Sequence, residues 1–124
     1  MEVLASSTPK TPEITYDEAG KRILISGRSY PEDLHAFWDP ITAKLEEIIL
    51  SSDSILVQFD LNYHNSGSTR IILNLIKFCE SDQASGCDII MEWQYDPDDE
   101  QTEEQGEDYR DICTKIDFKM VPTE

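Results

Sequence analysis

Positive charge is scarce in this chain. Its 124 residues include 10 Lys and Arg but 26 Asp and Glu, which gives a formal net charge of −16. A surface of this kind repels both nucleic acid and anionic lipid, so we expect neither as a partner. The same charge suits association with a basic protein surface.

Long apolar runs and paired cysteines are also missing. No stretch approaches the length of a membrane span, and the first residues, with an acid at Glu2, do not resemble a signal peptide. The cysteines Cys79, Cys87 and Cys113 lie apart and form no CxxC pair. This usage is typical of reduced thiols, so we expect a cytoplasmic protein.

Residue types that carry catalysis or hold cofactors are sparse as well. The histidines His35 and His64 have no partner at metal-ligand spacing, and the five glycines form neither a phosphate-binding fingerprint nor a GxSxG elbow. The sequence therefore predicts no enzyme activity, no cofactor and no metal centre. A weak hydrolase whose residues meet only in space stays open as an alternative.

The chain does contain alternating strand and helix patterns. Apolar residues alternate on both sides of Gly20 in "PEITYDEAGKRILISG" (12–27), which predicts a β-hairpin. A single apolar stripe at helical spacing runs through residues 29–53. Pro40 interrupts that stripe, so either the helix kinks there or a second helix starts there.

Further strands are predicted at 54–61, 87–95 and 116–121, with an amphipathic helix after the first of them and a short helix around Tyr109. The order ββαβαβαβ predicts a single α/β domain over residues 11–122. Its mixed sheet has four to five strands with helices packed on it. Residues 1–10 are polar and flanked by proline, which indicates a disordered tail.

The segment "DPDDEQTEEQGED" (96–108) is strongly acidic and comes close to the pattern of a calcium loop. Gln101 stands where the sharp turn of such a loop needs glycine, and Pro97 stands at its second position. A solvated acidic loop is the simplest interpretation. A docking surface for a basic partner and a small-ligand or metal sensor are the alternatives.

Hydroxyl groups crowd a strand-to-helix junction in "FDLNYHNSGSTRIILNLIKF" (59–78), at Ser66, Ser68 and Thr69. One such residue is enough to cap a helix, so capping is the simplest function of the cluster. A helix N-terminus also gathers free N–H groups and the positive end of the helix dipole. Phosphorylation there adds about −1.5 to −2 charges, which a partner would sense. The residues alone are compatible with a helix cap and with a phosphorylation site.

Four motifs together resemble the SiaC family of bacterial regulatory phosphoproteins, across about residues 11–120. They are "TPEI" (11–14), "SGRSYPED" (26–33), "NYHNSGSTR" (62–70) and "WQYDPDDE" (93–100) followed by "GEDYRD" (106–111). The resemblance implies a STAS-like fold, as in anti-sigma-factor antagonists, and a switched adaptor. In this family a dedicated kinase phosphorylates a hydroxyl at the start of a helix, and a PP2C-like phosphatase removes the phosphate. In its best-known members the unphosphorylated form activates a diguanylate cyclase, which raises cyclic-di-GMP and favours biofilm formation, and the resemblance implies the same here.

In this family the phosphoacceptor directly follows the motif asparagine, which here is Asn65. The resemblance therefore implies Ser66 as the acceptor, with Ser68 as its main rival and Thr69 third. A constitutive interaction module with a well-capped turn is the main alternative. We expect the partner to contact two groups of residues, the first around the acceptor and the second at the start of the first helix. They are Tyr63, His64, Asn65, Ser68 and Arg70, and Tyr30, Pro31 and Glu32.

Overall fold

The computed structural model describes residues 1–123. Within them, six strands and three α-helices alternate after an all-strand start, and one short 3₁₀ helix follows the second α-helix. The elements are β1 (Glu2–Ala5), β2 (Glu13–Asp17), β3 (Arg22–Ser29), α1 (Leu34–Leu50), β4 (Ser54–His64), α2 (Ser66–Glu80), η1 (Asp82–Ala84), β5 (Asp88–Tyr95), α3 (Glu100–Asp111) and β6 (Asp117–Pro122).

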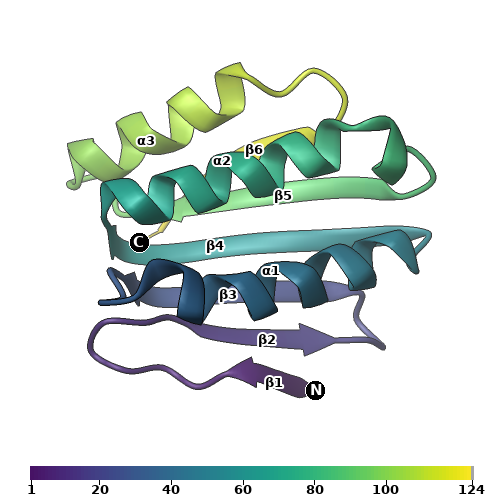
Figure 1. Cartoon of the computed structure of the whole chain (residues 1–124). Coiled ribbons are helices and arrows are strands. Elements are labelled where there is room, and N and C mark those ends of the chain that lie inside the picture. Colours follow the sequence, from purple (N-terminus) through teal and green to yellow (C-terminus); the bar gives the residue numbers. More distant parts are fainter. Residues whose placement is uncertain (124) are drawn as a thin grey trace.

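All six strands form one mixed sheet in sequence order, from β1 at one edge to β6 at the other. β1, β2 and β3 pair antiparallel, whereas β3 to β6 pair parallel. Each parallel connection contains one helix, and the three helices lie on the same side of the sheet (Figure 1). Right-handed crossovers that step in one direction along a sheet require this arrangement. The sheet therefore has a helix-covered face and an open face.

The core lies between the helices and the covered face. Alternate residues of the central strands point into it, among them Ile25, Val57, Phe59, Met91 and Trp93, all no more than 1% exposed. Burying side chains of this size stabilises the fold by roughly 1.5–3 kcal/mol each, before the entropy of ordering is counted. The predicted α/β domain with a mixed sheet is confirmed in class, and the strand count is higher than predicted.

Helix α1 (Leu34–Leu50) lies within the predicted segment 29–53 and continues through Pro40. Its N-cap is Asp33, whose carboxylate accepts a hydrogen bond from the Ala36 N–H at 3.1 Å. The helix runs through Pro40 without interruption, so no second helix starts there. The buried stripe on its inner side compensates for the backbone donor that proline lacks.

Two segments differ from the prediction. The disordered tail predicted over residues 1–10 was wrong for residues 2–5, which form the edge strand β1 and pair with β2. The acidic loop predicted over 96–108 was wrong beyond Asp99, because residues 100–111 form α3. Neither segment has a regular spacing of apolar residues. Residues 2–5 are ordered by pairing with β2, and residues 100–111 by packing against the sheet.

Helix α2 also holds the connection that leads into β6. The Glu80 carboxylate accepts hydrogen bonds from the N–H groups of Thr114 at 2.8 Å, Lys115 at 2.9 Å and Ile116 at 2.7 Å. Burial opposes ionisation of this carboxyl, but the hydrogen bonds, that of Ile116 first, lower its pKa to about 2. The α3–β6 connection is thereby fixed to the end of α2.

Candidate functional site

The junction between β4 and α2 lies where the parallel strands end. In Figure 1, the N-terminal ends of α1, α2 and α3 all lie at this edge of the sheet, on the left of the view. Asn65 has extended backbone angles and caps α2, since its Oδ1 accepts a hydrogen bond from the Ser68 N–H at 2.9 Å. Its carbonyl accepts the Thr69 N–H at 2.9 Å. The cap is therefore the asparagine, and the hydroxyls are not needed for that task.

Ser66 is the first residue of α2, and its side chain is exposed. Its position in the first turn places it beside backbone N–H groups that have no partner within the helix. An exposed hydroxyl next to unpaired donors is both accessible to an enzyme and able to carry a phosphate without unfolding the helix. Ser66 therefore lies exposed at a helix start, and its role as the phosphoacceptor stays a prediction.

Ser68 lies on the opposite side of the same turn, in the core. It is 0% exposed, as is Ser29 at the end of β3. The two Oγ atoms are 2.7 Å apart, and the Ser68 hydroxyl lies 2.9 Å from the Ser29 carbonyl, to which it donates. The Trp38 indole N–H of α1 donates to Ser29 Oγ at 3.2 Å. Ser68 thus joins β3, α1 and α2, and it does not lie on the surface patch predicted for it.

His64 is also part of the interior. It is 4% exposed, its Nε2 lies 2.8 Å from the Tyr109 hydroxyl of α3, and its ring packs edge-on against Trp93. Burial lowers the pKa of His64 to about 4, so the ring is neutral at pH 7. The prediction that His64 contacts a partner directly is not supported, because the side chain is covered by α3. Thr69, the third-ranked acceptor, is half-buried, and its hydroxyl donates to the Asn65 carbonyl at 3.2 Å.

The remaining predicted contact residues come together on one surface. β3 and β4 are parallel neighbours, and their register shifts by one residue of β4 after Gly27, whose φ is +111°, so that Arg28 lies opposite Tyr63 and Ser29 opposite His64. The rings of Tyr30 and Tyr63 consequently pack edge-to-face, with centroids 5.6 Å apart. The two predicted contact groups are therefore continuous.

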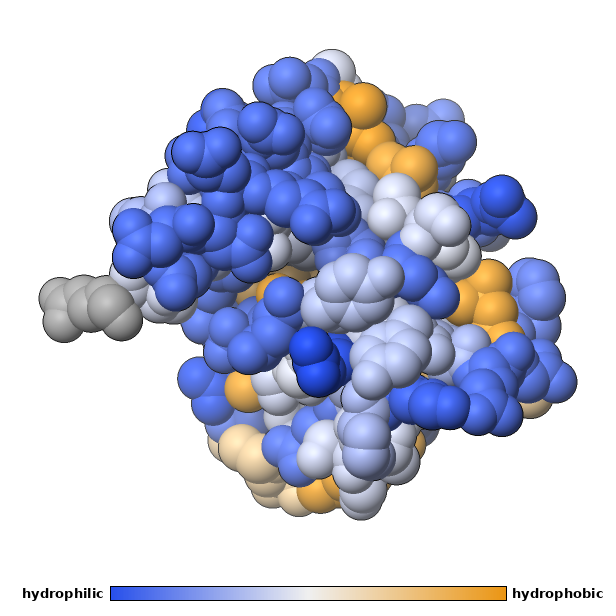
Figure 2. Space-filling view, turned by 90° about the vertical axis from the view of Figure 1, so that its left-hand side faces the viewer, coloured by the Kyte–Doolittle hydropathy of each residue, from blue (hydrophilic) through white to orange (hydrophobic). Residues whose placement is uncertain are grey.

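We call this surface the switch edge, and it is shown in Figure 2. It is mostly hydrophilic, with a group of less polar side chains near the middle of the view. Its members are exposed or half-buried: Tyr30, Pro31, Glu32, Tyr63, Asn65, Ser66 and Arg70. Glu32 also forms an ion pair with Lys10, which ties the segment before β2 to this edge.

The electrostatics of α2 differ from those of the other two α-helices in residues 1–123. α1 is capped by Asp33, and α3 is capped by Asp99 with Glu100 and Glu103 in its first turn. α2 has the neutral cap Asn65 and no acidic residue in its first turn. Its positive dipole end therefore remains uncompensated in a protein of net charge −16. A phosphate on this helix would meet no carboxylate of the same turn.

The acidic segment has a structural function that its sequence did not indicate. Asp99 Oδ1 accepts the Thr102 N–H at 3.1 Å, and its Oδ2 accepts the Thr102 hydroxyl at 2.7 Å. Because residues 100–111 are helical, they cannot follow the path of a calcium loop. Across residues 1–123, no three His, Cys, Asp or Glu side chains are grouped so that they could hold a metal ion.

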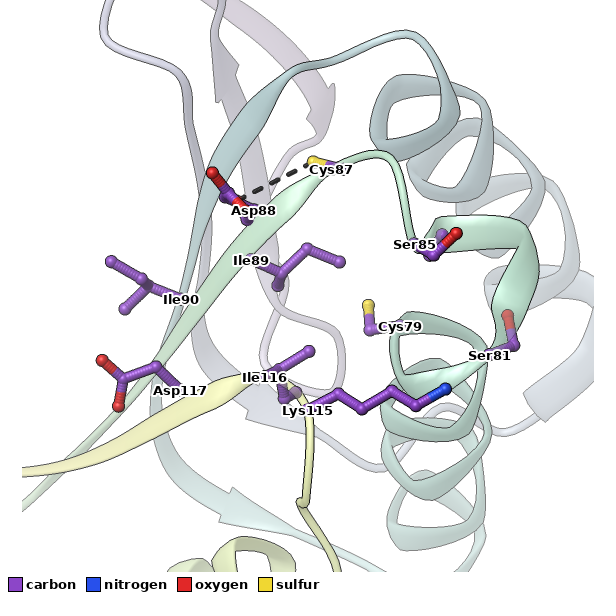
Figure 3. Close-up of a pocket in the computed structure, with 11 residues that line it drawn as sticks. Cys79, Ser81, Ser85, Cys87, Asp88, Ile89, Ile90, Lys115, Ile116 and Asp117 are labelled. Atoms are coloured by element: carbon purple, nitrogen blue, oxygen red, sulfur yellow. Dashed lines mark hydrogen bonds between the residues drawn. The ribbon is translucent and has the colours of Figure 1, made fainter.

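A cavity of about 370 Å³ lies at the opposite edge of the sheet, between α2, η1 and the start of β5 and β6. Figure 3 shows Cys79, Cys87, Ser81, Ser85 and Lys115 around it. Burial raises the pKa of the Cys79 thiol to about 12, so this sulfur is protonated at neutral pH and is a poor nucleophile. The cavity is far from Ser66 along α2, at the helix's other end.

Comparison with known protein families shows which family the chain belongs to. The model of the SiaC family regulatory phosphoproteins matches residues 5–123. The chain belongs to the SiaC family. The match agrees with the four motifs, and it includes Ala5 of β1 and every residue of the switch edge.

Individual relatives are distant in sequence but close in structure. An uncharacterised protein of Pseudomonas aeruginosa (strain UCBPP-PA14) is 25% identical over 108 residues, which are 86% of each chain. Apo-SiaC of P. aeruginosa has a TM-score of 0.84 at 23% identity, over 98% of this chain and 99% of that one. A chain from the crystal structure of the diguanylate cyclase SiaD with its activator SiaC has a TM-score of 0.85 at 23% identity, over 94% and 96%. These structures confirm the SiaC fold.

Within residues 1–123, no helix is both long and apolar enough to cross a membrane.

Sequence reasoning missed three residues that support the site, namely Ser29, Trp38 and Tyr109. Ser29 lies inside the "SGRSYPED" motif, and its position there was the only available signal. The contacts of all three are between elements distant in the chain, so no local pattern reports them.

Proposed function

We propose that this SiaC family protein is a phosphorylation-controlled adaptor with no catalytic activity of its own. Ser66 accepts the phosphate from a dedicated kinase, and a PP2C-like phosphatase removes it. The unphosphorylated switch edge binds an output enzyme, for which a diguanylate cyclase is the best candidate because a solved SiaC is the activator of the cyclase SiaD. The adaptor acts in the cytoplasm, where its three cysteines remain thiols.

The observation that carries this proposal is the pairing of an exposed Ser66 with a helix start free of acidic groups. Phosphorylation adds about −1.5 to −2 charges and three acceptor oxygens between Tyr63 and Arg70. The first turn of α2 can receive this charge, so the backbone is retained. A partner shaped to the unmodified surface then meets new charge and bulk, which weakens binding.

Phosphate mapping tests the acceptor. The purified protein is incubated with ATP and a candidate kinase, and peptides are sequenced by mass spectrometry. We expect one phosphate, on Ser66, in the wild type and in Ser68→Ala, and none in Ser66→Ala. Phosphate on Ser68 in the wild type would contradict the proposal, since that hydroxyl is buried.

Binding to the cyclase tests the switch itself. Ser66→Ala should bind as the wild type does, and Ser66→Asp should bind about tenfold or more weakly, because a charge is placed in the interface. Arg70→Ser changes an exposed position one turn further along α2. Its affinity for the cyclase shows whether the binding part of the switch edge extends to Arg70. Equal affinity of Ser66→Ala and Ser66→Asp would support a constitutive interaction module instead.

A further inference from the structure

The open face of the sheet is unusual for parallel strands. β3, β4, β5 and β6 are parallel, and parallel sheets are almost always covered on both faces. Here α1, α2 and α3 all cover one face (Figure 1), and within residues 1–123 no element covers the other. This surface is distinct from the switch edge, which lies at the strand ends.

Apolar side chains lie together at the centre of the open face. Leu56 on β4 is in register with Ile90 on β5, and Leu24 on β3 lies diagonally across from Leu56. Their strand neighbours Ile23, Ile55 and Ile89 point into the core, so these three point outward. Ile90 is 37% exposed, and Leu24 and Leu56 are half-buried. They form an apolar ridge across three strands.

The charge around this ridge is negative. Of the basic residues on the face, Lys119 forms an ion pair with Asp117 at 3.6 Å, Arg22 is in register with Asp17, and Arg28 near the end of β3 is exposed. The charge of Lys119 is therefore matched by an acidic neighbour, and acidic residues outnumber basic ones on this face. Other acidic side chains on the same face form no ion pair among residues 1–123, and they include Glu13, Asp60, Asp88 and Glu92.

We propose that the open face is a second docking surface, which takes a basic amphipathic helix of a partner protein. A helix is the element that covers the opposite face, and an apolar stripe flanked by Lys and Arg would match the ridge and the surrounding carboxylates that form no ion pair among the described residues. A second copy of this chain would bring a like-charged face against it. An anionic lipid surface would be repelled in the same way.

A designed peptide tests the chemistry of this surface. The probe is an 18-residue peptide of Leu and Lys with leucines at helical spacing, and its control has the same composition in scrambled order. Both are titrated into the isotope-labelled full-length protein, and amide chemical shifts are followed by NMR. We expect the amphipathic probe to perturb residues around Leu24, Leu56 and Ile90, and the scrambled peptide to bind at least about tenfold more weakly, because it lacks a continuous apolar stripe.

Matched variants locate the site. Ile90→Lys should weaken binding of the probe about tenfold or more, because it removes an isoleucine that the bound peptide would cover and adds a charge of the same sign as the peptide's lysines. Ile112→Lys makes the same change at a residue 44% exposed at the end of α3, and it should leave affinity within about twofold. Ile90→Thr, which preserves strand propensity, is a second test if the lysine variant folds poorly.

Three results would overturn the proposal: shifts centred on the acidic side of α3, equal binding of the scrambled peptide, or equal loss in Ile90→Lys and Ile112→Lys. A concentration-dependent dimer that Ile90→Lys abolishes would overturn it in favour of a second copy. Ser66→Asp should bind the probe as the wild type does, so failure here and failure of the phosphoswitch are independent outcomes.

Discussion

At the scale of single residues, three neighbouring side chains of one helical turn have three separate tasks. Asn65 caps α2, Ser66 is exposed, and Ser68 is buried against Ser29. Successive residues of a helix point in directions about 100° apart, so hydroxyls two positions apart can face solvent and core. This separation means that the modified residue and the structural residue can be changed independently.

Ser66→Ala and Ser68→Ala should differ in stability. Ser68→Ala removes the partner of two buried polar atoms of Ser29, and we expect a loss of about 1–3 kcal/mol in the free energy of unfolding. Ser66→Ala alters an exposed position and should stay within about 0.5 kcal/mol of the wild type. Urea denaturation followed by circular dichroism measures both. Similar losses in the two variants would contradict the structure.

Buried His64 makes stability depend on pH. Its pKa is about 4 in the folded protein, against 6.5 in its ordinary state, so the unfolded chain takes up a proton first as the pH falls. This contribution is complete above pH 6.5 and declines as the pH falls towards 4. Between pH 7 and pH 5 the free energy of unfolding should fall by about 2 kcal/mol.

The test measures urea unfolding at several pH values in that interval. His64→Gln should reduce the slope, because no imidazole then titrates beside Tyr109. His35→Gln, which changes the exposed histidine, is the matched control. A wild-type slope that survives in His64→Gln would rule out His64 as its source.

At the scale of elements, the sequence predicted those segments whose apolar residues have a regular period. The hairpin of β2 and β3, the helices α1 and α2, and the strands β4, β5 and β6 were all predicted from such patterns. β1 has only four residues and owes its structure to pairing with β2. α3 presents Thr102, Gly106 and Tyr109 to the interior, and two of these three carry no apolar signal.

Gly106 shows how closely α3 packs. A Cβ at this position would lie 2.3 Å from Trp93 Cδ1 and 2.7 Å from the Met120 methyl group. Alanine has the better helix propensity by about 1 kcal/mol, but the clash should outweigh it. Gly106→Ala should therefore lower the free energy of unfolding by about 1–3 kcal/mol.

Gly86→Ala is the matched control, because a Cβ there meets no atom within 4 Å. It should be neutral or stabilise the fold by about 0.4–1 kcal/mol through the unfolded chain. Thermal unfolding of the two variants beside the wild type makes the comparison. A stabilised Gly106→Ala would show that α3 does not lie on Trp93 as described.

At the scale of the whole molecule, the arrangement separates two surfaces. The strand ends carry the switch edge, and the open face carries the apolar ridge around Leu56 and Ile90. The protein's net charge of −16 is spread over one small domain, so like charges repel one another in the folded state. Salt should reduce this repulsion.

The midpoint of thermal unfolding should therefore rise with ionic strength. We expect a steady increase as NaCl goes from about 10 mM to about 300 mM, where the screening length falls well below the size of the domain. Calorimetry at constant pH measures it, and sucrose at matched osmolality is the uncharged control. A midpoint that falls with salt would show that attractive ion pairs outweigh the repulsion.

The sequence by itself determined the alternation of helices and strands, the acidic surface and the family motifs. Each of these depends on residues close together in the chain. The tertiary structure alone decided which hydroxyl of the cluster is exposed, because Ser68 is buried against Ser29, 39 positions away, at the end of the strand β3 that pairs with β4. It also decided that all three helices lie on one face, since that follows from the order of strands in the sheet.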